Sequence, residues 1–150
     1  TKQRRPAKRH RVSKPEQRQK NISTRKLHVL IAEDDLISRT VAVKIIEQFG
    51  HSSHAVENGK EVLDTLAAGS FDLIIMDVQM PVLDGLKATE LIRKDHCGKK
   101  HSDIPIIALT ACAMEGDMEK LLALGMNGYV EKPLNIKTLE MEIDRVIQAT

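Results

Sequence analysis

The chain has 150 residues, enough for one domain of ordinary size. Its apolar fraction of 41% can build a core, but aromatic residues make up only 2%, which largely excludes aromatic platforms for single-stranded nucleic acid. No apolar run approaches the length of a membrane span, and no apolar segment follows the basic N-terminus, so neither a transmembrane helix nor a secretory signal is expected. Cys97 and Cys112 are too few for a disulfide framework or a four-thiolate metal site, and a reducing interior, cytosol or nucleus, is the default.

The net charge of +2 conceals a strong asymmetry between the two parts of the chain. Residues 1–26 hold 11 of the 23 basic residues and one of the 21 acidic residues, a net charge of +10, which leaves −8 for residues 27–150. The basic arm has almost no large apolar side chains, so we expect a disordered linker or tail followed by one acidic domain. Because the chain begins at Thr1 without Met, we expect it to be an excerpt from a longer protein.

From residue 27 onward, short apolar runs alternate five times with amphipathic stretches. The runs predict strands at residues 28–32, 53–56, 71–76, 105–109 and 128–130. The amphipathic stretches predict helices at residues 36–49, 59–68, 84–95, 113–124 and 136–148. In the first helix, the apolar residues expected on one face are Ile37, Val41, Ile45 and Phe49. Five strand-helix units of this length predict a doubly wound α/β domain, a parallel sheet with helices on both faces.

Ligands of such a sheet bind at the carboxyl ends of its strands, and these ends are polar here. The first expected strand is followed by Glu33 and Asp34, the third by Asp77, the fourth by Thr110 and the fifth by Lys132. Three carboxylates in a small volume repel one another, and a divalent cation offsets that repulsion. Carboxylate oxygens with room for water favour Mg²⁺.

A carboxylate beside Mg²⁺ can also attack phosphorus and form an aspartyl phosphate. Asp77 is the best-placed candidate nucleophile, with Thr110, Lys132 and backbone N–H groups to neutralise the phosphoryl oxygens. The sequence contains neither GxGxxG nor GxxxxGK[ST], so no phosphate-cradling loop for a nucleotide cofactor is expected.

The strings HVLIAEDD, LIIMDVQMPVLDG, IIALTA and GYVEKP follow one another in the order and spacing of the receiver domains of response regulators, and the chain resembles this family over residues 28–148. The resemblance implies a flavodoxin-like sheet of strand order 2-1-3-4-5 and Mg²⁺ as cofactor. It assigns Glu33 and Asp34 to the acidic pair, Asp77 to the phosphoacceptor and the backbone carbonyl of Gln79 to the metal. It also makes Lys132 the essential lysine and Thr110 and Tyr129 the switch residues.

The sequence departs from the family pattern at two positions of the acidic segment. The family's acidic pair is usually two aspartates, whereas Glu33 stands first here, a variation associated with receivers of hybrid histidine kinases. Asp35 adds a charge where a neutral residue is common. Gln79 and Cys112 occupy positions that modulate acyl phosphate hydrolysis in the family. A cis peptide is expected between Lys132 and Pro133.

The resulting hypothesis is a phosphorelay module in which a phospho-histidine donates its phosphoryl group to Asp77 in the presence of Mg²⁺. The partner is then a histidine kinase or a histidine phosphotransfer protein. Phosphorylation is expected to turn Thr110 inward and change the rotamer of Tyr129, which switches the face formed by the helix at 113–124, the strand at 128–130 and the last helix.

The sequence ends with the last helix, so we expect no output domain after it, and the favoured context is the C-terminal receiver of a hybrid histidine kinase. The receiver would catalyse its own phosphorylation and dephosphorylation, in a cytoplasmic setting even if the parent protein is attached to a membrane. A stand-alone receiver is the alternative. A second alternative is that the basic arm binds nucleic acid or an anionic membrane, but no recognition helix accompanies the arm. A small-molecule phosphatase is disfavoured because its second acid would have to stand at Gln79.

Other residues have simpler interpretations. Asp35 and Asp84 are expected to cap helices, and the six histidines lack the spacing of a metal site. Ser38 and Arg39, near the start of the first helix, fit two roles equally well: contact with a partner, or part of a solvated face.

Overall fold

The computed structural model describes residues 25–96, 98–111 and 115–149 of the chain. The basic arm up to residue 24, Cys97 and Cys112 lie outside these residues. The strands are β1 (His28–Ala32), β2 (Ser52–Val56), β3 (Leu73–Asp77), β4 (Ile106–Thr110) and β5 (Gly128–Glu131). The helices are α2 (Leu36–Gln48), α3 (Gly59–Ala68), α4 (Gly85–Arg93), α5 (Glu115–Ala123) and α6 (Ile136–Gln148), with a short 3₁₀ helix, η1 (Lys99–His101), before β4.

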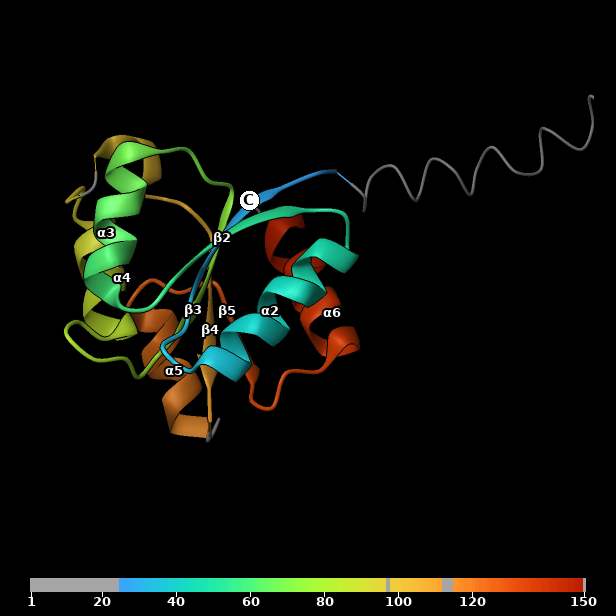
Figure 1. Ribbon diagram of the computed structural model, residues 1–150. Coiled ribbons are helices and arrows are strands. Elements are labelled where there is room, and N and C mark those ends of the chain that lie inside the picture. The colour runs from blue at the N-terminus through green and yellow to red at the C-terminus, as the bar shows by residue number, and fades with distance from the viewer. Residues whose placement is uncertain (1–24, 97, 112–114, 150) are drawn as a thin grey trace, which may run out of the picture.

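The strands form one parallel sheet in the order β2-β1-β3-β4-β5, and the predicted strand order is confirmed. Helices α2 and α6 cover one face of the sheet, and α3, α4 and α5 cover the other (Figure 1). Side chains alternate between the faces along each strand, as the pleat requires. Leu30 and Ile74 therefore pack under α3 and α4, whereas Ile31 and Ile75 pack under α2 and α6. The predicted doubly wound architecture is confirmed.

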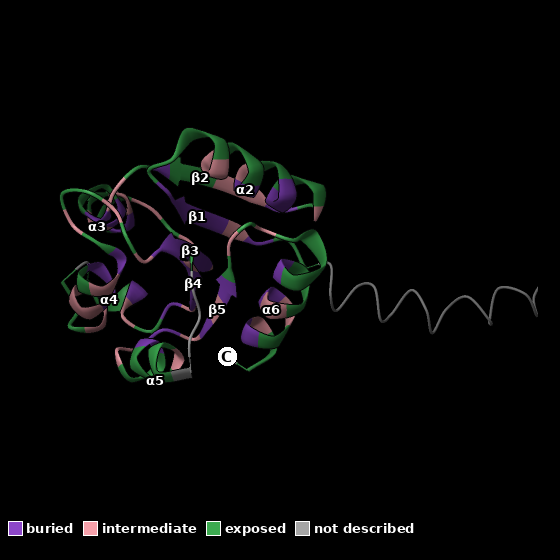
Figure 2. Cartoon of the chain, turned by 90° about the horizontal axis from the view of Figure 1, so that it is seen from below, coloured by how far each residue is buried: buried purple, intermediate pink, exposed green. Residues whose placement is uncertain are grey.

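Both faces of the central strands are buried, which explains the continuous apolar runs in the sequence (Figure 2). All five residues of β3 are buried, including Asp77 at its carboxyl end. Polar side chains cap the helices that return the chain to the sheet. The Asp35 carboxylate accepts a hydrogen bond from the Ser38 N–H at 2.9 Å, and the Asp84 carboxylate accepts one from the Lys87 N–H at 2.8 Å. Both predicted helix caps are confirmed.

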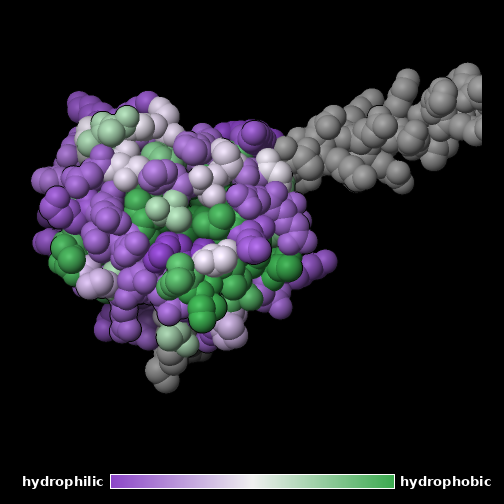
Figure 3. All heavy atoms as spheres, viewed as in Figure 1, coloured by the Kyte–Doolittle hydropathy of each residue, from purple (hydrophilic) through white to green (hydrophobic). Residues whose placement is uncertain are grey.

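The predicted apolar face of α2 is wrong. The structure buries Ala42, Ile45 and Ile46 and leaves Ile37 74% exposed and Val41 39% exposed. Residues four apart on a helix drift by about 40° per step, so a series from residue 37 to 49 turns through about 120° and cannot all face the sheet. The last part of the series packs on the sheet. The first turn is left in solvent, and apolar side chains gather on the surface over this end of α2 (Figure 3).

Two features away from the strand ends bear on stability. The first is a pair of buried histidines, since ring nitrogens of His51 and His101 accept hydrogen bonds from the backbone N–H groups of Leu27 and Phe71 at 3.1 and 3.2 Å. Burial lowers the pKa of each imidazole; for His51 the negative Asp144 opposes this effect.

The second feature is the exposed Val82, which has a φ of 66° in a tight turn between β3 and α4.

Candidate functional site: an acidic pocket at the strand ends

The polar residues that follow the strands meet at one edge of the sheet. Glu33, Asp34 and Asp77 each offer one carboxylate oxygen, and these three oxygens lie within 4.8 Å of one another. The register of the strands explains this proximity. Ala32 at the end of β1 pairs with Met76 of β3, and the next residues in the sequence are Glu33 and Asp77. Glu33 and Asp77 are buried, whereas Asp34 is exposed, so the cluster has one open side.

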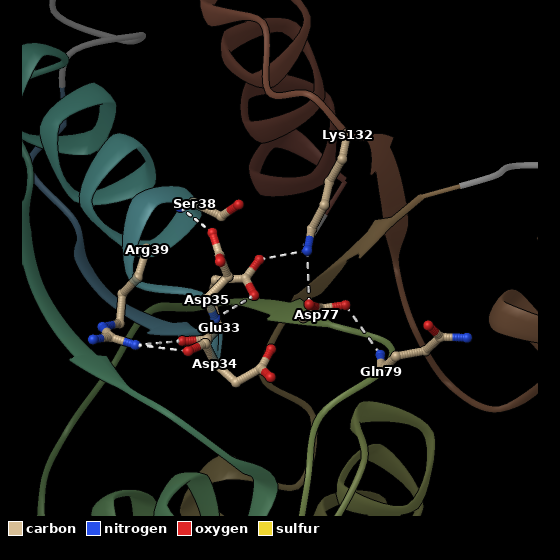
Figure 4. Close-up of polar contacts among 8 residues, drawn as sticks. All are labelled: Glu33, Asp34, Asp35, Ser38, Arg39, Asp77, Gln79 and Lys132. Atoms are coloured by element: carbon tan, nitrogen blue, oxygen red, sulfur yellow. Dashed lines mark hydrogen bonds and ion pairs between the residues drawn. The ribbon is translucent and has the colours of Figure 1, made fainter.

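Lys132 crosses from the end of β5 to the two buried acids (Figure 4). Its Nζ lies 2.6 Å from Glu33 Oε1 and 2.7 Å from Asp77 Oδ2. Two like charges no more than 4.8 Å apart repel by at least about 3 kcal/mol at an effective dielectric constant of about 20, and a cation between the carboxylates offsets this repulsion. The ammonium group supplies that charge from the protein itself.

The ionisation of the site reflects this arrangement. Burial raises the pKa of Glu33, and its proximity to Asp77 raises it further, while hydrogen bonds from Lys132 and from the Asp35 N–H oppose the shift. Burial tends to lower the pKa of Lys132, but hydrogen bonds to Asp77 and Glu33 outweigh it and raise the pKa. Lys132 therefore stays protonated at neutral pH, and its hydrogen bond to Glu33 partly offsets the cost of burying the negative charge of that acid.

Backbone groups hold the phosphoacceptor candidate in place. The Gln79 N–H donates a hydrogen bond to Asp77 Oδ1 at 3.0 Å, while Asp77 Oδ2 faces Lys132. The Gln79 side chain extends away from the carboxylates (Figure 4). Gly85, at the start of α4, lies so close that a Cβ atom there would stand 2.3 Å from the Asp77 carbonyl oxygen.

These groups line a cavity of about 1230 Å³. Glu33, Asp34, Asp77, Gln79, Thr110 and Lys132 all border it, so the structure brings together six of the seven site residues predicted from the sequence. The seventh, Tyr129, instead lines a neighbouring groove of about 790 Å³ between α5, β5 and α6. Lys132 connects the two regions, because it borders both and its N–H donates a hydrogen bond to the Thr110 carbonyl oxygen at 2.8 Å.

Sequence reasoning missed Asp117 and Lys120 at this site, and for Arg39 it considered only contact with a partner or a solvated face. Asp117 and Lys120 of α5 also border the cavity, but their sequence pattern is that of an ordinary solvated helix face. Arg39 of α2 contacts the backbone of the acidic pair, with Nη1 3.0 Å from the Glu33 carbonyl oxygen and 3.3 Å from that of Asp34. A side chain that binds main-chain atoms leaves no trace in the spacing of motifs.

The donor set is suited to Mg²⁺. Three carboxylates at one open cavity provide hard oxygen ligands and leave space for water, as a magnesium site requires, and among the described residues no thiol or imidazole joins the cluster. Glu33 and Asp34 on one loop and Asp77 on the neighbouring strand are the residues that would hold the ion.

Comparison with known proteins identifies the family. The model of the response regulator receiver domain matches residues 29–144. The chain belongs to this family. It is 43% identical over 125 residues to hybrid signal transduction histidine kinase G of Dictyostelium discoideum, a match that covers 82% of the chain and 4% of that kinase. It is 33% identical to two-component response regulator 24 of Arabidopsis thaliana, covering 79% of the chain and 83% of that protein.

Solved receiver structures agree with this assignment. The receiver domain of the sensor histidine kinase PA1611 of Pseudomonas aeruginosa, crystallised with a magnesium ion in its active site cleft, has a TM-score of 0.74 and 34% identity and covers 83% of the chain and 99% of that domain. The receiver domain of Saccharomyces cerevisiae Ssk1, co-crystallised with the histidine phosphotransfer protein Ypd1, is also similar, with a TM-score of 0.73 and 31% identity, over 83% of the chain and 92% of the matched chain.

Two smaller expectations have definite outcomes. The peptide bond between Lys132 and Pro133 is cis, as predicted. In the described residues, no helix is long and apolar enough to cross a membrane. The chain spans only a small part of the hybrid kinases it matches, 4% and 10% of the first two, so the activity of a longer parent protein is a separate question.

Proposed function

We propose that this receiver domain accepts a phosphoryl group on Asp77 in a phosphorelay, with Mg²⁺ held by Glu33, Asp34 and Asp77. The observation that carries the proposal is the geometry of Asp77, whose carboxylate borders an open cavity beside two further acids and Lys132. The backbone carbonyl of Gln79 is proposed as a further metal ligand, as in the family. Bound Mg²⁺ would supply positive charge to the carboxylates and to the incoming phosphoryl oxygens.

The protein's own residues supply the rest of the reaction. One oxygen of the Asp77 carboxylate attacks the phosphorus of a phospho-histidine, the new O–P bond forms as the P–N bond breaks, and the electron pair of that bond leaves with the donor imidazole. Lys132 is already 2.7 Å from Asp77, so its ammonium can contact a phosphoryl oxygen as charge accumulates. The Gln79 N–H keeps the carboxylate oriented throughout.

The added phosphoryl group carries about 1.5 to 2 negative charges at neutral pH, and this charge is proposed to switch the domain. Thr110 borders the same cavity as Asp77 and can bond the phosphoryl group from the end of β4. Tyr129 borders the groove between α5, β5 and α6, so a rotamer change there would alter that face. The switch is a shift between two populations of this surface.

The phosphodonor and phosphoacceptor partners are proposed to be a histidine kinase and a histidine phosphotransfer protein. Matches to hybrid kinases and to the receiver of the Ypd1–Ssk1 complex support this context. The chain would be the receiver segment of a hybrid histidine kinase, a position that agrees with Glu33 as the first acid. Since histidine phosphorylation draws on ATP, the domain is proposed to act in the cytoplasm.

Phosphorylation by acetyl phosphate tests the proposal. In the presence of Mg²⁺ the wild type is expected to gain the mass of one phosphoryl group in intact-mass spectrometry, and Asp77→Asn is expected to gain none. Asp64→Asn removes one carboxylate from the exposed face of α3 and should be phosphorylated like the wild type. Chelation of Mg²⁺ should abolish the reaction. Phosphorylation of Asp77→Asn at the wild-type rate would refute the assignment of the phosphoacceptor.

A further inference from the structure

Arg39 lies on the opposite side of the acidic pair from Lys132 (Figure 4). Its Nη1 donates hydrogen bonds to the main-chain carbonyl oxygens of Glu33 and Asp34, at 3.0 and 3.3 Å. Its Nη2 lies 3.8 Å from a carboxylate oxygen of Glu57, which directly follows β2. One guanidinium therefore joins the ends of two neighbouring strands at the edge where the acids lie.

The Arg39 side chain is the more buried partner in the ion pair with Glu57. It is 18% exposed, whereas that of Glu57 is 63% exposed, so the ion pair with Glu57 is a surface contact of little energy. The hydrogen bonds to the carbonyl groups are charge-assisted and come from a planar, rigid donor group. They fix the backbone of the two residues whose side chains contribute two of the three clustered carboxylates.

We propose that Arg39 is a positioning residue for the divalent cation, holding the backbone of Glu33 and Asp34 so that their carboxylates are preorganised for binding. This inference rests on the proposed Mg²⁺ site. Groups that orient metal ligands without touching the metal commonly change its affinity by about 10- to 100-fold when they are removed.

The sign of the effect separates positioning from simple electrostatics. The guanidinium is positive, so its field alone opposes the binding of another cation, and its removal should then tighten Mg²⁺ binding. If Arg39 acts by positioning, its removal loosens the acidic loop and weakens binding instead. The two roles predict opposite changes in the dissociation constant.

The test is a titration with MgCl₂ at constant ionic strength, followed by amide chemical shifts in NMR spectra. Arg39→Met keeps a long side chain and is expected to raise the dissociation constant about tenfold. Arg39→Lys retains the charge and one donor group, and we expect it to restore part of the affinity. Lys44→Met removes a positive charge from an exposed position on the same helix and should leave the affinity unchanged or slightly tighter.

Two further measurements distinguish positioning from a general loss of stability. Ile45→Val weakens the packing of α2 in the core and should lower the unfolding temperature without changing Mg²⁺ affinity. Without Mg²⁺, Arg39→Met should speed hydrogen exchange of the Asp35 amide, which bonds to the Glu33 carboxylate at 3.1 Å, relative to Lys44→Met.

Each outcome bears on a specific claim. Unchanged or tighter Mg²⁺ binding by Arg39→Met, in a wild type that binds saturably, overturns the positioning role and leaves the proposed metal site intact. An equal loss of affinity in Ile45→Val would also overturn it, because the effect would then follow stability. A wild type with no saturable binding overturns both the metal site and the inference.

Discussion

Replacing Gly85 by alanine should destabilise the domain and distort the site, because the new side chain would clash with the backbone of Asp77. A Cβ atom at residue 85 would lie 2.3 Å from the Asp77 carbonyl oxygen and 3.2 Å from Met76 Cγ. Carbon atoms in proteins essentially never approach an oxygen closer than 3.0 Å in this way, so one backbone must move by about 0.7 Å. The opposing atom belongs to the main chain of a central strand, which cannot rotate away as a side chain would.

The expected cost is therefore at the upper end of the range for overpacking, about 3 kcal/mol. For a domain of this size that corresponds to a fall of about 10 °C in the unfolding temperature. Because the displaced atom belongs to Asp77, phosphorylation by acetyl phosphate should also slow in the fraction that remains folded. Thermal and urea unfolding followed by circular dichroism measure the first effect, and intact-mass spectrometry measures the second.

The matched control is the same substitution at Gly116 in α5. Among the residues that the structure describes, no atom other than those of its chain neighbours and of its own helix backbone lies within 4 Å of a Cβ built there. Gly116→Ala should therefore stabilise the domain by about 0.4 to 1 kcal/mol, because alanine has less conformational freedom to lose in the unfolded chain. The reasoning is refuted if Gly85→Ala unfolds within about 0.5 kcal/mol of the wild type.

Three further predictions concern the turn, the histidines and the metal. Val82→Asn should raise the free energy of unfolding by about 1 kcal/mol, because a β-branched residue is strained at a φ of 66° whereas asparagine tolerates this conformation. Urea titrations measure the change, and a neutral or destabilising result would contradict the strain at Val82. Burial keeps the folded pKa of His51 and His101 below the unfolded value of about 6.5, so stability is full above pH 6.5 and should fall as the pH is lowered below 6.5. His51→Gln should flatten that decline, and an unchanged slope would exclude His51 as a source. Mg²⁺ at about ten times its dissociation constant should stabilise the wild type by about 1.4 kcal/mol in thermal unfolding, and Asp77→Asn should lose most of this gain.

Much of the fold follows from local signals in the sequence. The boundaries of β1 agree with the prediction because its apolar run ends at the charged Glu33. Those of α3 and α6 also agree, and local signals mark them: Asn58 and Asn135 accept hydrogen bonds at the helix starts, and Gly69 ends α3. The 3₁₀ helix η1 was not predicted, since a single turn in the polar segment before β4 has no hydrophobic period to reveal it.

The site was predictable to the extent that it follows from topology. Parallel strands bring their carboxyl ends to one edge, so the order of the strands along the chain is enough to group the acids with Thr110 and Lys132. The contact between Lys132 and Glu33 could not be predicted from that grouping, because it depends on the conformations of the two side chains. The role of Arg39 was left open for a related reason, since its partners are carbonyl oxygens that every residue possesses.

The strand order also explains why a long basic side chain stands after β5. Asp77 belongs to β3, and β4 separates β3 from β5, so the ends of these two strands lie about 10 Å apart. Thr110 at the end of β4 pairs with Glu131, which places Lys132 one residue beyond the sheet, free to extend across the end of β4. A short side chain at this position could not reach the carboxylates. The salt bridge to Asp77 therefore depends on the register of β4 and β5 as much as on the charge of the lysine.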